Sequence, residues 1–161
     1  MQYLMFPMLF VGLLICAAHG DLVLPQFNTN IETYRIFGSE HPGPYKHPAS
    51  ITQLQNGDFY IAYYGGDHEY SDNTAIYGSR RLKNEFTWSC PESIAKTPFH
   101  GVGNPVVWQA PDGLVWLFYN MQFGDTWSNA RVAAKLSNDG AHTWSDSFML
   151  TMEEGSMVRG Q

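Results

Sequence analysis

Charged residues, cysteines and long apolar runs are scarce in this chain of 161 residues. Only 15% of its residues are charged while 44% are hydrophobic, which excludes an intrinsically disordered protein. Its formal net charge of −6 and the absence of any basic run make nucleic acid an unexpected partner. No Cys and His cluster has zinc-ligand spacing, so we expect neither a metal nor a cofactor.

The one long apolar run, residues 4–18, lies at the N-terminus. Ala18-His19-Gly20 follows it with the small residues that a signal peptidase reads, so residues 1–20 are predicted to be the signal peptide of a secreted protein. The run is short for a membrane span and contains Pro7, so no stable membrane insertion is expected after signal removal. An uncleaved anchor is the alternative.

The sequence has two cysteines, Cys16 and Cys90. Cys16 would leave with the signal peptide, and Cys90 would then remain alone in an oxidising compartment. Such a residue is either buried and unpaired, or bonded to a partner outside this sequence.

Aromatic residues make up 15% of the chain and occur with many Gly and Pro, which favours short strands and tight turns. The sequence also repeats at an offset of 56 residues, a period typical of propeller blades. The repeating anchors are Gly57 and Gly113, residues 59–63 and 115–119, and Thr87-Trp88-Ser89 and Thr143-Trp144-Ser145, with Pro48 and Pro105 one residue out of step.

Each repeat is predicted to form a four-stranded antiparallel sheet. The expected strands are residues 49–54, 58–64 and 75–80 in the first copy, and 105–109, 115–120 and 130–136 in the second. Asn56-Gly57 and Pro111-Asp112-Gly113 provide the hairpin turns. Two sheets cannot close a propeller, so we expect residues 46–161 to be the first two blades of a larger ring. Residues 21–45 form a separate segment that could supply a ring-closing strand.

Residues 137–144 have the pattern of an Asp box, with Ser137, Asp139, Thr143 and Trp144 as its structural residues. Oxygens of the Ser and Asp can accept hydrogen bonds from backbone N–H groups of the turn, and the Trp can pack between sheets. The first copy keeps only the Thr87-Trp88 end. Ala141 stands where Gly is usual, which predicts some strain in the turn.

From Lys46 onward the chain resembles the sialidase-like (neuraminidase-like) family of Asp-box or BNR-repeat proteins, which form six-bladed propellers. The resemblance rests on residues 47–51, 56–58, 64–69, 75–80, 104–107, 111–113 and 116–119 and on the Asp box. It implies an all-β fold, here an N-terminal fragment of about two blades of a six-bladed β-propeller of sialidase type. It also implies that ligands bind at the centre of the ring.

The resemblance implies a catalytic acid/base in the loop of residues 65–74. Asp72 lies in the family's acid/base position, Glu69 is the second catalytic candidate, and Asp67 is a substrate-binding candidate. Neighbouring carboxylates can keep one member protonated near neutral pH. A solvated polar loop is the alternative.

The resemblance also assigns candidate substrate-binding residues outside this loop. Lys46 takes the place of an Arg that pairs with the substrate carboxylate, while a second such Arg would fall at Gly65-Gly66 and is missing. His47, Asn104, Trp127 and the upstream Arg35 complete the set. The alternatives are a surface charge for Lys46, a packed strand-entry residue for His47 and blade packing for Trp127.

These features predict a secreted carbohydrate-active protein that acts on glycans, an exo-glycosidase of sialidase type that uses an Asp of blade one. The family's nucleophilic Tyr, its Glu and further Arg residues would lie beyond Gln161, so the chain alone is predicted to be inactive. A non-catalytic carbohydrate-binding propeller is the main alternative, and a protein-interaction propeller is a third. The sugar and its linkage are not specified by the sequence.

Overall fold

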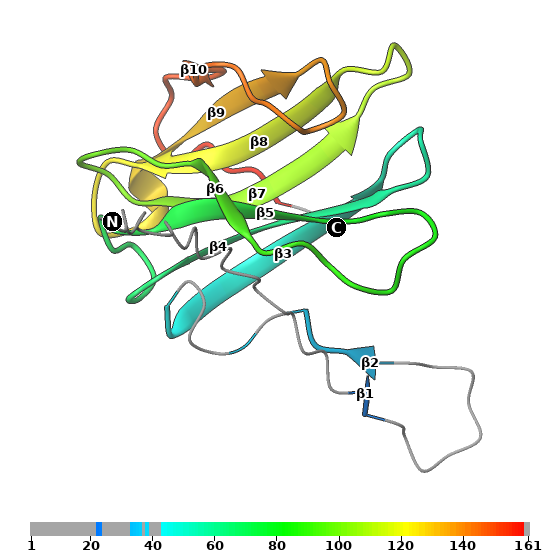
Figure 1. Cartoon of the computed structure of the whole chain (residues 1–161). Helices are drawn as coiled ribbons and strands as arrows, with labels where there is room; N and C mark the ends of the chain where they lie inside the picture. Colours follow the sequence, from blue (N-terminus) through cyan, green and yellow to red (C-terminus); the bar gives the residue numbers. More distant parts are fainter. Residues whose placement is uncertain (1–21, 24–32, 37, 39–42, 160–161) are drawn as a thin grey trace, which may run out of the picture.

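The computed structural model describes residues 22–23, 33–36, 38 and 43–159 (Figure 1). Apart from the 3₁₀ helix η1 (Trp127–Asn129), the regular structure of these residues is entirely β. None of their helices is long and apolar enough to cross a membrane. The predicted signal peptide, residues 1–20, lies outside the described residues, and so its prediction stands untested.

Two four-stranded antiparallel sheets make up the body of the chain, as predicted. Blade one has the order β3-β4-β5-β6, with β3 (Tyr45–Gln53), β4 (Phe59–Gly66), β5 (Ala75–Arg81) and β6 (Glu92–Ala95). Blade two has the order β7-β8-β9-β10, with β7 (Val102–Gln109), β8 (Val115–Gln122), β9 (Ala130–Ser137) and β10 (Phe148–Met149). Strands β4 and β8 begin and end 56 residues apart, which confirms the repeat.

The inner strands begin earlier than predicted. The expectation that they start at residues 49 and 105 is wrong, because β3 and β7 begin at Tyr45 and Val102. The two prolines lie inside these strands, where the pairing shifts between Lys46 and Ala49 and again between Gly103 and Val106. A bulge leaves a residue unpaired, so it tolerates a proline that has no N–H to donate.

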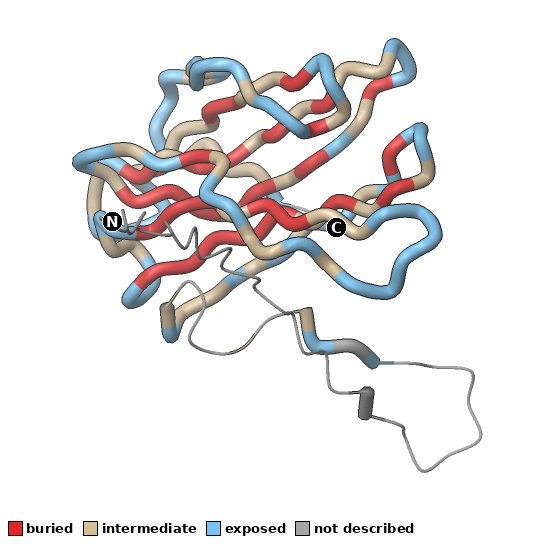
Figure 2. Tube along the Cα trace, in the orientation of Figure 1, coloured by how far each residue is buried: buried red, intermediate tan, exposed pale blue. Residues whose placement is uncertain are grey.

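The hydrophobic core lies between the two sheets, where Figure 2 shows buried segments of both blades facing each other. Alternate residues of β4 point into it and meet the facing side of blade two. Its buried members are Leu54, Tyr60, Ala62, Tyr64, Ile76 and Ala95 of blade one and Val102, Val107, Val115, Leu117, Tyr119, Ala133 and Ala141 of blade two. Neither sheet could bury its apolar face alone, so the two blades stabilise each other.

The other face of blade two is also apolar. Trp116 stacks on Phe118 with ring centroids 5.3 Å apart and meets Phe148 edge-on at 6.4 Å. Trp108 and Phe148 are 48% and 38% exposed on this face. We expect a further sheet to pack here in the way that blade two packs on blade one.

The short strands β1 (Leu22–Val23) and β2 (Thr33–Tyr34) pair with each other in a two-stranded ribbon. Figure 1 draws this ribbon apart from the two blades. The ring-closing role of the N-terminal segment therefore stays a prediction.

Cys90 lies two residues before β6 and is disulfide-bonded in the structure. None of the described residues is a free cysteine. Of the two states expected from the sequence, the unpaired buried thiol is therefore wrong.

The Asp box forms the turn that was predicted for it. Ser137 Oγ accepts from the Ala141 amide at 2.8 Å, and Asp139 Oδ1 accepts from the amides of His142 and Thr143 at 3.0 and 2.9 Å. Thr143 Oγ1 donates to Asp139 Oδ2 at 2.6 Å. Ala141 has φ 67°, a left-handed conformation that favours glycine, so the expected strain is present.

Trp144 packs between the sheets, with its ring centroid 6.2 Å from that of Tyr60. Blade one keeps more of the motif than its sequence indicated. In both blades a serine clamps the preceding strand: Ser89 Oγ accepts from the Arg80 amide at 3.0 Å and Ser145 Oγ from the Leu136 amide at 2.9 Å. The expectation that blade one has lost its turn chemistry is wrong for this clamp.

Acid should weaken the Asp-box turn. Hydrogen bonds from Thr143 and Ser137 hold the pKa of Asp139 far below its usual value of 3.8. A depressed pKa in the folded state contributes stability above pH 3.8 that is lost as the pH falls toward the folded-state value. Unfolding midpoints measured between pH 5 and pH 2 should therefore fall less steeply for Asp139→Asn than for Asp125→Asn, an exposed control outside the turn. Equal slopes for the two variants would contradict this assignment.

Candidate functional site

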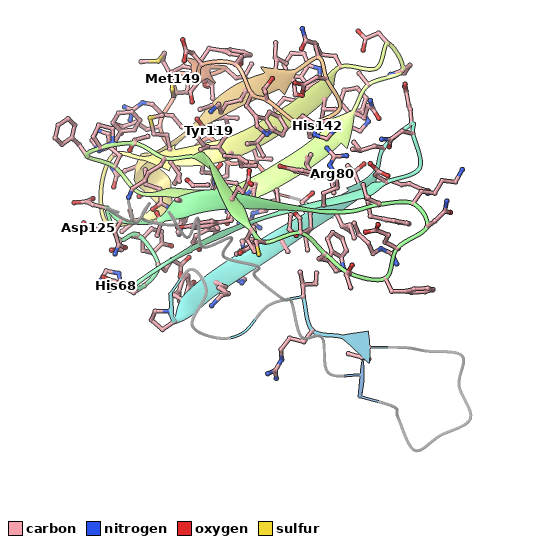
Figure 3. The ribbon with its side chains drawn as sticks, viewed as in Figure 1. His68, Arg80, Tyr119, Asp125, His142 and Met149 are labelled. Carbon is pink, nitrogen blue, oxygen red and sulfur yellow. The ribbon has the colours of Figure 1, made fainter. Side chains whose placement is uncertain are left out.

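The candidate residues of both blades lie at one end of the sheets. The starts of β3 and β7, the β4–β5 loop and the β8–β9 loop meet at this end because the strands are antiparallel. We call it the bulge end and define it by residues 45–48, 66–74, 100–105 and 122–130. Figure 3 shows His68 and Asp125 at the bulge end, and Arg80 and His142 beside the Asp box at the opposite end.

The acidic loop of residues 67–74 is shaped by Asn73. The Oδ1 atom of Asn73 accepts from the Asp67 amide at 3.2 Å and from Ser71 Oγ at 2.8 Å, while the Thr74 amide donates to the Ser71 carbonyl at 3.0 Å. Tyr70 adopts the left-handed φ of 63°. This folding leaves Asp67, Glu69 and Asp72 exposed.

Asp72, the acid/base candidate, forms no hydrogen bond or ion pair with any described residue. Its neighbour Thr74 is fully buried and anchors the loop, because Thr74 Oγ1 accepts from the Val102 amide of blade two at 2.8 Å. A Cβ on Gly101 would lie 2.8 Å from the Ser71 carbonyl oxygen, so only glycine permits this close approach. The loop carrying Asp72 is thus fixed against blade two while its carboxylate remains accessible.

Glu69 lies beside a group of tyrosines that the sequence reading did not single out. The rings of Tyr45 and Tyr64 are 5.9 Å apart. Burial raises the pKa of Tyr64, and the hydrogen bond with Tyr45 and the charge of Glu69 raise it further. Burial and Glu69 also raise the pKa of Tyr70. Their signal in the sequence is Tyr63-Tyr64-Gly65-Gly66, whose second Tyr falls on the core face of β4. Neutral phenols beside a carboxylate can donate hydrogen bonds to it or to a ligand oxygen.

Lys46 and His47 line a cavity of about 220 Å³ at the bulge of β3. Pro48, Ala49, Ile61 and Tyr63 complete its wall. Lys46 pairs with Gly65 across the ladder, and its ammonium donates to the Gly43 carbonyl. His47 is exposed, with its ring 6.2 Å from that of Tyr64. The structure therefore brings Lys46 and His47 next to the strand that leads into the acidic loop.

Blade two contributes Asn104 and an aromatic surface to the bulge end. Asn104 lies in the bulge of β7 with φ 46°. Trp127 is 56% exposed at the start of η1, so packing within the described blades does not occupy its ring. Sequence reasoning missed Phe123, whose ring lies 4.6 Å from that of His100 and 4.5 Å from the Arg131 guanidinium carbon.

Arg35 follows β2 and is exposed. It belongs to the segment outside the two sheets, and no contact joins it to a described residue of the bulge end. Within the described part of the chain, no group of three or more His, Cys, Asp or Glu side chains could hold a metal ion.

The model of the BNR repeat-like domain matches residues 57–160, well over half of the chain. The chain belongs to the BNR repeat-like family. Its two sheets are the β-structure expected for part of a sialidase-like propeller, and the sialidase-like resemblance drawn from the Asp box is confirmed.

Two solved structures share the fold of this BNR repeat-like chain. The Hadza microbial sialidase Hz136 matches with a TM-score of 0.58 at 17% identity over 74% of this chain and 30% of that one. A protein of unknown function from Dyadobacter fermentans DSM 18053 matches with a TM-score of 0.51 at 19% identity over 62% of this chain and 35% of that one. The matched region thus spans about a third of either structure. No curated protein matches the chain.

Proposed function

We propose that this BNR repeat-like chain is part of a secreted exo-glycosidase of sialidase type that removes terminal sugars from glycans. The observation that carries the proposal is the bulge end, where an accessible Asp72 on an anchored loop lies at the same end as Lys46, His47 and Trp127. Secretion rests on the apolar run before Asp21 and its small residues.

In this proposal Asp72 is the general acid and base. It donates a proton to the glycosidic oxygen as the bond from that oxygen to the anomeric carbon breaks, and it later removes a proton from the attacking water. The buried Thr74 anchor holds the loop in place during both steps. Glu69, beside the Tyr64 and Tyr70 phenols, supplies a second negative charge that opposes ionisation of Asp72.

Lys46 is the proposed partner of a negatively charged substrate group. Its ammonium is a compact point charge and lacks the two-pronged geometry of a guanidinium. His47 and Asn104 flank it as hydrogen-bonding groups on the two bulges. The nucleophile and the remaining cations belong to other blades, so activity is a property of the complete ring.

The direct test is incubation of the intact protein with a panel of sialosides and neutral glycosides, followed by NMR detection of released sugar. We expect hydrolysis of a terminal linkage with one anomer formed first. Glycan binding without hydrolysis would favour the second candidate below. No hydrolysis and no binding on the whole panel would overturn both.

The second candidate is a non-catalytic carbohydrate-binding propeller. The exposed rings of Trp127 and Phe123 favour it, because flat aromatic faces suit the apolar face of a pyranose. It also agrees with glycine at positions 65 and 66 beside Lys46.

Loss of the Trp127 ring should weaken glycan binding under either candidate. We expect Trp127→Ala to raise the Kd for glycans by about tenfold, the scale of one aromatic contact. The matched control is Phe86→Ala, which removes a 75% exposed ring in the β5–β6 connection of blade one. Calorimetric titration of both variants checks this, and equal affinities would remove Trp127 from the site.

A further inference from the structure

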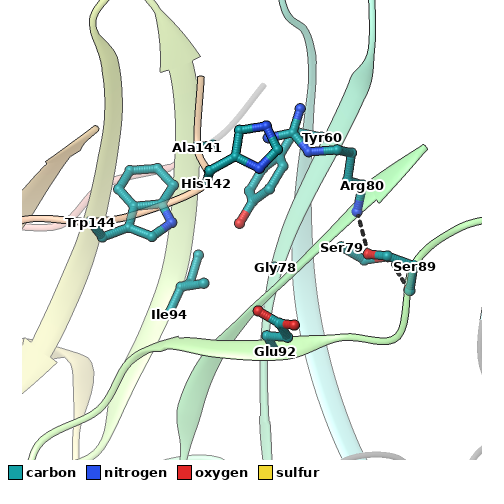
Figure 4. A pocket seen from close by; sticks show the side chains of 10 residues that line it. All are labelled: Tyr60, Gly78, Ser79, Arg80, Ser89, Glu92, Ile94, Ala141, His142 and Trp144. Atoms are coloured by element: carbon teal, nitrogen blue, oxygen red, sulfur yellow. Dashed lines mark hydrogen bonds between the residues drawn. The ribbon is translucent and has the colours of Figure 1, made fainter. Parts of the chain in front are cut away.

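A second cavity lies between the two blades at the end opposite the bulge end. Its volume is about 230 Å³, and Figure 4 shows it bounded by strands of blade one and by the Asp-box turn of blade two. The side chains that matter for its chemistry are Tyr60, Arg80, Glu92, Ile94, His142 and Trp144. Because both walls come from adjacent blades, the described residues form the cavity without help from another blade.

Three polar groups of this cavity have no hydrogen-bond partner among the described residues. The indole nitrogen of Trp144 is buried and donates to none of them, although it lies close enough to the Tyr60 hydroxyl to oppose the rise of its pKa. Tyr60 and Glu92 likewise form no side-chain hydrogen bond within the described residues. Figure 4 shows the Tyr60 hydroxyl, the Trp144 indole nitrogen and the Glu92 carboxylate turned toward the same space.

The protonation of Tyr60 makes it a donor. Burial raises the pKa of Tyr60 to about 12, so the phenol stays neutral at physiological pH. Its position depends on Gly78, because a Cβ there would lie 2.0 Å from the Tyr60 hydroxyl oxygen. The cavity thus combines an indole N–H donor, a phenol and a carboxylate acceptor.

The charges of the wall decide which ligands fit. Arg80 is already paired with Asp58 at 2.9 Å, and the side chains of both are only 10% exposed. Glu92 is therefore the anionic group left to meet a ligand. A ligand carboxylate cannot donate to Glu92 and is repelled by it, while an ammonium cannot accept from the Trp144 indole. A hydroxyl group does both.

The size of the cavity excludes a single water as its natural content. One water takes up about 30 Å³ in the liquid, while drug-sized ligands need at least about 300 Å³. Ile94, Ala141 and the indole of Trp144 add apolar wall. We propose that this interblade cavity binds a neutral hydroxyl-rich ring of monosaccharide size, with ligand hydroxyls donating to Glu92 and accepting from Trp144. This site is separate from the bulge end and does not rest on the proposed hydrolysis.

The test is NMR on the intact protein labelled with ¹⁵N-tryptophan. Trp144→Phe assigns the indole resonance of Trp144, which is then followed during titration with methyl β-galactoside and methyl α-mannoside. Glucuronic acid and ethanolamine are the anionic and cationic comparators. We expect a saturable shift with at least one neutral glycoside and weaker effects with both comparators.

Glu92→Ala should weaken this binding at least tenfold, because it removes a hydrogen bond to a charged acceptor. Glu92 is an exposed side chain of the short strand β6, so folding should tolerate the change. Glu85→Ala, also exposed, is the control and should bind like the parent. A shift that grows linearly without saturation, a stronger response to a charged comparator, or equal binding by the two Glu variants would overturn the proposal.

Discussion

Asp72→Asn is expected to lower kcat for glycoside hydrolysis by about 10²- to 10⁴-fold, the usual contribution of a general acid or base. An amide cannot donate the proton that the leaving oxygen needs. The loss should be larger for glycans with alkyl leaving groups than for activated aryl glycosides, which depart with less protonation. A purely structural role would reduce both substrates alike.

Asp125→Asn is the matched control, because Asp125 is an exposed carboxylate on the equivalent loop of blade two. We expect this variant to keep the parental kcat. Steady-state kinetics on both substrate types, with circular dichroism to confirm folding, measures the difference. Undiminished hydrolysis by Asp72→Asn would remove Asp72 from the mechanism.

Asp58→Asn is expected to lower the free energy of unfolding by about 3 kcal/mol, the scale for breaking a buried ion pair. Asp58 is 7% exposed and accepts from the Arg80 guanidinium at 2.9 Å and the Lys83 amide at 3.0 Å. Burial alone would raise the pKa of Asp58, but these hydrogen bonds outweigh it and hold the pKa below 3.8. Asparagine would leave the Arg80 charge buried without its counter-ion.

The effect should extend to the contact between the blades. Arg80 also donates to the Gly140 carbonyl of the Asp-box turn, so one guanidinium joins the β4–β5 hairpin of blade one to blade two. Glu154→Gln is the control for an exposed ion pair: Glu154 is 3.1 Å from Arg131, its side chain is 66% exposed, and its loss should cost less than about 1 kcal/mol. Urea unfolding of both variants checks the contrast, and equal costs would contradict it.

The sheets could be predicted because their determinants are local and repeated. Gly57 and Gly113 both adopt φ 92° at hairpin turns, and the alternating apolar residues that follow them specify β4 and β8. The Asp box could be predicted because its hydrogen bonds join residues only two to four apart. The period of 56 residues then located the strands that carry the candidate site.

The features that sequence reasoning missed depend on pairing between distant residues. Pro48 and Pro105 resemble residues that precede a strand, and only the register of the neighbouring strand shows that they lie in bulges. The ion pair of Asp58 joins residues 22 apart, and neither partner belongs to the repeat. Glu69 was identified as acidic, but its position beside Tyr64 follows from the path of the loop.

The account's central claim is that glycans bind at the bulge end. Hydrogen exchange of the intact protein, carrying Asp72→Asn to stop hydrolysis and Glu92→Ala to weaken the interblade cavity, tests it most directly. With a bound terminal glycan we predict slower exchange in residues 66–74, 100–105 and 122–130. Slower exchange confined to residues 137–145, or none in either region at saturating glycan, would contradict the claim.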